Sequence, residues 1–167
     1  MHTVCRCTAF TRQGYNTVSF ADAVLAIVPQ CRHAQPLLEL LSKQHATLHV
    51  SNLATVLKRL LQVCFNGPQR VFAAQWDKNT LLLLSNLLME HGGNPPVVEA
   101  VIGVVWLLCF VDSVKAAVKD DQNNILSLLQ TVHASMSSNG PVQERFSAIR
   151  AMCKLHVGGD ASSGFGW

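Results

Sequence analysis

Charged residues are scarce in this sequence. They make up 14% of its 167 residues, and hydrophobic residues make up 49%, whereas a soluble protein typically has about a quarter of its residues charged. That balance suits a single domain of stacked layers, one member of a larger assembly, or a fragment of a longer array. The formal net charge of +3 is small and dispersed, so nucleic acid is not the partner that we expect.

Long apolar runs are also missing. The first seven residues are not followed by the apolar stretch of a signal peptide. The most apolar segment, Val97 to Val111, spans 15 residues, contains Glu99 and follows Pro95-Pro96, whereas a membrane-spanning helix needs about 20 residues. We therefore expect no membrane span and interpret this segment as a buried central helix.

Recognisable catalytic and metal-binding patterns are absent as well. The histidines have no nucleophile or carboxylate at a recurring spacing, and Gly92-Gly93 precedes Asn-Pro-Pro without the lysine of a phosphate-binding loop. Cys5 and Cys7, together with Cys31 and His33, lack the spacing of a structural zinc site. We expect a protein that is not an enzyme and that holds neither a cofactor nor a metal ion.

Three of the six cysteines recur at nearly constant spacing. Cys64 and Cys109 are 45 residues apart, and Cys153 follows 44 residues later. Cysteine often serves as a small buried apolar residue, and its recurrence at one position of a repeat predicts that role here. Reduced cysteines indicate an intracellular compartment. We expect that compartment to be the cytoplasm.

A leucine-rich stretch occurs three times with a spacing of 44 residues. Each copy opens on a side-chain amide and closes on a polar residue, which is typical of stacked supersecondary units. We expect the leucines at 38, 82 and 126, and those at 40, 84 and 128, to form the stack. The three copies are Gln35–Ser42, Asn79–Asn86 and Asn123–Gln130.

Apolar periodicity and turn residues predict an all-helical chain. Gly103 lies inside the central helix, where glycine costs about 1 kcal/mol relative to alanine, so we expect two helices to approach closely there. The glycine- and serine-rich residues 158–167 are predicted to be a disordered tail, which leaves 1–157 as the folded domain. The expected segments are 16–28, 35–43, 53–64, 69–76, 79–90, 97–108, 112–121, the third leucine-rich helix, and a last helix from about 141 to His156.

The segments Gly93–Leu108 and Asn124–Leu129 resemble the start and the third helix of the armadillo repeat, which is close to the HEAT repeat. The resemblance covers roughly residues 16–155. It implies a short right-handed α-solenoid of about three armadillo-like repeats. Importin-type members hold a basic peptide with a Trp and an Asn four residues apart, whereas Trp76 and Asn79 are three apart, so that activity is not carried over.

Polar positions of the leucine-rich helices are the candidate functional residues. If these helices stack as in armadillo proteins, their polar positions form a strip on the concave wall, where amides can bind the main chain of a partner. For Gln35, Asn79 and Asn123 we favour helix capping. For Ser42, Asn86 and Gln130, two interpretations stay open. Each is either a capping or solvated surface residue, or a residue that binds a partner. The candidate partner-binding residues are Glu39, Ser42, Leu83, Asn86, Ser127 and Gln130, among which Leu83 is expected to provide an apolar pocket.

The function that we expect is a non-catalytic scaffold that binds another protein or peptide on this concave surface. One alternative is a structural segment of a larger chain or complex. Another is RNA binding through a basic ridge that includes Lys58-Arg59, Arg145, Arg150 and Lys154. The scaffold hypothesis predicts that Asn86 and Gln130 lie on one open surface and that Cys64, Cys109 and Cys153 are buried.

Overall fold

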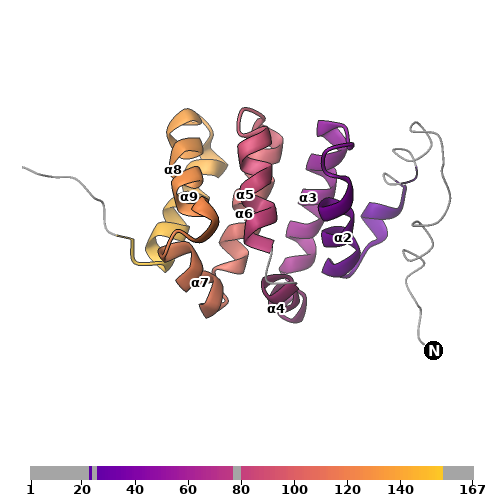
Figure 1. The fold of residues 1–167 in the computed structure, drawn as a ribbon, viewed down its shortest axis with the longest axis horizontal. Helices are drawn as coiled ribbons and strands as arrows, with labels where there is room; N and C mark the ends of the chain where they lie inside the picture. Colours follow the sequence, from indigo (N-terminus) through magenta and orange to yellow (C-terminus); the bar gives the residue numbers. More distant parts are fainter. Residues whose placement is uncertain (1–22, 24–25, 77–79, 156–167) are drawn as a thin grey trace, which may run out of the picture.

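The computed structural model describes residues 23, 26–76 and 80–155, and within these ranges the chain is all-helical, with no strand (Figure 1). Most of the helix expected over 16–28, the cap expected at Asn79 and the tail at 158–167 lie outside the described residues. The elements are η2 (Val28–Gln30), α2 (Ala34–Gln44), α3 (Val50–Cys64), α4 (Gly67–Gln75), α5 (Thr80–His91), α6 (Pro95–Leu108), α7 (Asp112–Lys119), η4 (Gln122–Asn124), α8 (Ile125–Ser135) and α9 (Gly140–Met152).

The helices recur in a fixed order of a long, a short and an intermediate helix. The long helices α3, α6 and α9 begin at Val50, Pro95 and Gly140, each 45 residues after the one before. The short helices α4 and α7 and the intermediate helices α5 and α8 repeat at the same interval. Helix boundaries therefore follow a period of 45 residues, one more than the spacing of the leucine-rich stretches.

Three helices begin at an Asn-x-Pro sequence. The side-chain oxygens of Asn66, Asn94 and Asn139 accept hydrogen bonds from the backbone amides of the third residues of α4, α6 and α9, at 3.4, 3.4 and 3.1 Å. The proline two residues after each asparagine lies in the first turn, where its missing amide has no partner to lose. The sequence thus sets each of these starts locally.

The helices pack in two layers. In one layer α6 lies between α3 and α9, and in the other α5 packs against α2 and α8, while α2, α5 and α8 each also contact the long helix of their own pair. Figure 1 shows the pairs α2–α3, α5–α6 and α8–α9 following one another along the long axis of the molecule, with α4 and α7 at one edge. Helix α6 occupies the centre, as expected from its apolar sequence, and ten of its residues are buried.

The leucine positions that form the core differ from the expected ones. Leu38 is fully buried, but Leu82 is 41% exposed and Leu126 is only partly buried. Burial instead makes Leu38 equivalent to Leu84 and Leu129, all of which are 0% exposed. The predicted stack of leucines 38, 82 and 126 is therefore wrong. In a run of consecutive leucines, matching residues by identity alone does not determine which side of the helix each leucine occupies.

Cys64, Cys109 and Cys153 are buried free thiols, which confirms the expectation for them. Cys64 ends α3, and Cys109 and Cys153 directly follow α6 and α9. Burial raises the pKa of the Cys64 thiol to about 12, against a smaller lowering by the charge of Arg70. Burial likewise raises the pKa of Cys109 and of Cys153. These thiols act as small apolar side chains.

None of the described helices is by itself both long enough and apolar enough to cross a membrane. Helices α6 and α7 satisfy length and composition only when taken together, and the pair is bent by 120°.

Candidate functional site

The helices α2, α5 and α8 each keep one side open to solvent. The open residues recur at intervals of three and four, so on each helix they occupy one face. Because the opposite faces pack on α3, α6 and α9, the three open sides all turn away from that layer, and we call them together the open face. It comprises Gln35, Glu39, Ser42 and Lys43 of α2, Leu82, Asn86, Met89 and Glu90 of α5, and Ser127, Gln130, Thr131 and Ala134 of α8.

Asn86 and Gln130 both belong to the open face. Asn86 is partly buried and lies between Leu82, which is 41% exposed, and Met89, which is 61% exposed. Among the described residues, neither the Asn86 nor the Gln130 side-chain amide has a hydrogen-bond partner, although each can both donate and accept. These two residues combine open polar groups with neighbouring apolar surface.

Glu39 and Ser42 make hydrogen bonds within their own helix. The side-chain amide of Gln35 donates to a Glu39 carboxylate oxygen at 2.9 Å, and the Ser42 hydroxyl donates to the Glu39 backbone carbonyl at 3.0 Å. Gln35 is the second residue of α2 and does not cap it. The first amide of that helix, at Ala34, donates to Gln69 from α4 at 2.9 Å. The capping role expected for Gln35 is therefore wrong.

Ser127 is bound to Asp121, which caps α8. One Asp121 oxygen accepts from the backbone amides of Leu126 and Ser127 at 2.8 and 3.1 Å, and the other accepts from the Ser127 hydroxyl. Burial alone raises the pKa of Asp121, but the bonds from Ser127 and Leu126 outweigh it and hold the pKa below its usual value. Asn123 has a positive φ of 59° and lies in η4, so the cap expected there is wrong.

Leu83 lies in the core and does not belong to the open face. It is 7% exposed, whereas the preceding residue, Leu82, is 41% exposed. Successive residues of a helix point about 100° apart, so an error of one residue moves a side chain from the surface to the core. The expectation that Leu83 contacts a partner is corrected, and Leu82 takes its place. Sequence reasoning also missed Met89, although the spacing from Leu82 through Asn86 to Met89 is the signal of one helical face.

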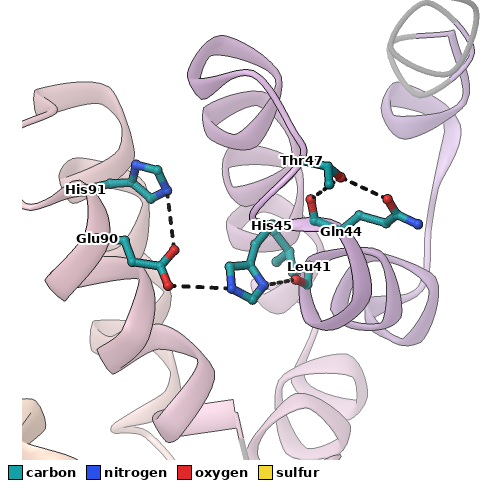
Figure 2. Close-up of polar contacts among 6 residues, drawn as sticks. All are labelled: Leu41, Gln44, His45, Thr47, Glu90 and His91. Atoms are coloured by element: carbon teal, nitrogen blue, oxygen red, sulfur yellow. Dashed lines mark hydrogen bonds and ion pairs between the residues drawn. The ribbon is translucent and has the colours of Figure 1, made fainter. Parts of the chain in front are cut away.

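A histidine–glutamate cluster joins α2 to the end of the open face on α5 (Figure 2). Glu90 lies between His45 and His91, with carboxylate oxygens 3.7 and 3.8 Å from their Nε2 atoms. The second ring nitrogen of His45 is 2.9 Å from the Leu41 carbonyl oxygen. The His91 Nε2 atom is buried and makes no hydrogen bond. In the part of the chain that the structure describes, neither this cluster nor any other forms a metal-binding group.

No protein-family model, curated protein or solved structure matches this chain. The candidate site is therefore defined by its own geometry.

Proposed function

We propose that this protein is a non-catalytic scaffold that binds a segment of another protein on the open face. Its layered helices would form a short right-handed solenoid of armadillo-like units, in keeping with the 45-residue recurrence of helix starts. The observation that carries the proposal is the pair of Asn86 and Gln130. Their amides have no hydrogen-bond partner among the described residues, and they stand on neighbouring helices of one layer.

The partner in this proposal is an extended peptide. Packed helices lie about 8–10 Å apart, a distance that an extended chain covers in about three residues. The amides of Asn86 and Gln130 would each bind one peptide group of the partner, since each offers a donor and an acceptor. Leu82 and Met89 would cover apolar side chains of the partner. Glu39, Ser42 and Ser127 would line the contact, while keeping their present bonds.

The cellular setting of the proposal is a reducing compartment, the cytoplasm. Cys64, Cys109 and Cys153 are buried free thiols in the described part of the chain, and such thiols persist where disulfides do not form.

The proposal is tested by site-specific photo-crosslinking in cells. A photoreactive phenylalanine analogue is placed at Met89 or at Gln130, with a matched control at Ser113, which is exposed on α7. We expect positions 89 and 130 to capture the same protein and position 113 not to capture it. Capture of unrelated proteins at 89 and 130, or equal capture at all three positions, would refute a specific contact at the open face.

A further inference from the structure

Three aromatic side chains form an exposed cluster at the ends of α3 and α6. The ring of Trp106 lies 6.3 Å from that of Phe65 and 5.9 Å from that of Phe110, with interplanar angles of 72° and 73°. Phe65 is 61% exposed and Phe110 is 53% exposed. Trp106 is partly buried and packs against the core, so the exposed apolar surface comes mainly from Phe65 and Phe110. Exposed apolar patches commonly mark interaction sites. We call this cluster, together with Arg70, the aromatic edge.

Arg70 from α4 completes the aromatic edge. Its guanidinium carbon lies 5.1 Å above the centre of the Phe110 ring, a distance typical of a cation–π contact. Within the described ranges no carboxylate pairs with Arg70, since the ion pairs there involve only Glu90 and Asp112. The Arg70 guanidinium is thus left to pair with a carboxylate from outside the described residues.

The same residue types recur one unit later. The dipeptide Cys64-Phe65 is repeated as Cys109-Phe110 after 45 residues, and Arg70 is followed at the same interval by Lys115. In both dipeptides the cysteine is buried and the phenylalanine is exposed. Lys115, however, already pairs with Asp112 at 2.9 Å. Repetition places two exposed rings at equivalent positions of adjacent units, with Arg70 as the cation left for a partner.

We propose that the aromatic edge is a second protein-binding surface, and that it takes an acidic segment of another protein that also carries an apolar side chain. Aromatic residues and arginine are enriched at the centres of protein interfaces. A carboxylate of the partner would pair with Arg70 in a charge-assisted bond, and its apolar side chain would cover Phe65, Trp106 and Phe110. Single-stranded RNA fits less well, because it needs a row of cations along its backbone and this edge offers one.

The test is a selection of random twelve-residue peptides displayed on phage against the full chain. Enriched peptides are then measured by fluorescence polarisation on the wild type and on three variants: Phe65→Ala with Phe110→Ala, Arg70→Gln, and Met89→Ala as the control on the open face. A fluorescent twelve-nucleotide oligouridylate is measured in parallel. Thermal unfolding and circular dichroism show which variants stay folded.

We expect the enriched peptides to combine acidic residues with leucine or an aromatic residue. Their Kd should rise about tenfold or more in both aromatic-edge variants, and added salt should weaken binding to the wild type more than to Arg70→Gln. The Met89→Ala variant should bind these peptides like the wild type, so this result does not depend on the function proposed for the open face. Enrichment of basic peptides, no enrichment, unchanged affinity in Arg70→Gln, or tighter binding of the oligouridylate would overturn the proposal.

Discussion

Gly103 of α6 faces Leu61 of α3 so closely that a Cβ atom added to the glycine would lie 2.9 Å from a Leu61 methyl carbon. The same added atom would lie 3.2 Å from Nη1 of Arg145, which donates to the Glu99 backbone carbonyl at 2.7 Å. Three successive long helices thus meet at one glycine. This confirms the close approach expected from the sequence and makes Gly103 a sensitive point of the layered packing.

Gly103→Ala should lower the free energy of unfolding by about 1 kcal/mol. The alanine gains helix propensity, but it overfills the space between α3, α6 and α9, which costs about 1–3 kcal/mol. Urea unfolding followed by circular dichroism measures the difference. Gly140→Ala is the matched control, because nothing lies within 4 Å of its added Cβ atom. A Gly103→Ala variant as stable as this control would contradict the close packing.

Cys64 and Cys109 should resist alkylation in the folded protein. The thiolate is the reactive form, and burial raises the pKa of Cys64 to about 12 and that of Cys109 as well. Iodoacetamide at pH 8, followed by peptide mapping, should label both residues only after the protein is unfolded in urea. Rapid labelling of either thiol without denaturant would show that its side chain reaches solvent.

Asp121→Asn should destabilise the protein near neutral pH by about 1 kcal/mol, the typical value of a helix cap. The Asp121 pKa is lowered in the folded state, so its carboxylate stabilises the fold at pH values above the unfolded value of about 3.9. That contribution is lost as the pH falls through the folded pKa. The difference in free energy of unfolding between wild type and variant should therefore be complete at pH 6 and should decrease below pH 4.

The control for this experiment is Asp120→Asn, since Asp120 is exposed and its side chain makes no hydrogen bond among the described residues. Chemical unfolding at several pH values compares the three proteins. Equal loss in the two variants, or a gap that widens in acid, would argue against capping by Asp121.

His91→Met should leave stability unchanged or raise it by up to about 1 kcal/mol. The His91 Nε2 atom is buried and makes no hydrogen bond, since the Glu90 oxygen at 3.8 Å is too far away for one. Replacing such a group with an apolar one of similar size removes its desolvation cost. Met136 stands 45 residues later, at the end of α8, so the next unit already uses methionine there. His45→Met is the comparison, because it gives up the 2.9 Å contact with the Leu41 carbonyl. A large loss in thermal stability for His91→Met alone would show that its ring has a structural role.

Sequence reasoning succeeded where local signals fix the structure. Asn94 and Asn139, with the prolines in the first turns of α6 and α9, determine the starts of these helices. The recurrence of Cys64, Cys109 and Cys153 predicts their burial. It failed where the result depends on which side of a helix a residue occupies. Adjacent leucines allow several alignments, and only packing shows that Leu84, and not Leu82, corresponds to Leu38.

The aromatic edge and the Asp121 cap were missed for different reasons. The repeated Cys-Phe dipeptide is visible in the sequence, but the cysteines alone were compared between units. The capping role of Asp121 depends on left-handed backbone at Asn123 and Asn124. Asparagine adopts that conformation more readily than most residues, yet nothing in the sequence requires it here.

In the proposed function, Asn86 and Gln130 together hold the partner segment. The most direct measurement is the Kd of the protein captured at positions 89 and 130, determined by calorimetric titration against the wild type, Asn86→Ala with Gln130→Ala, and Ser113→Ala. We predict at least about a tenfold weaker Kd for the double variant, which corresponds to about 1.4 kcal/mol, with unchanged stability and an unchanged Kd for Ser113→Ala. A folded double variant that binds the partner as tightly as the wild type would contradict the claim.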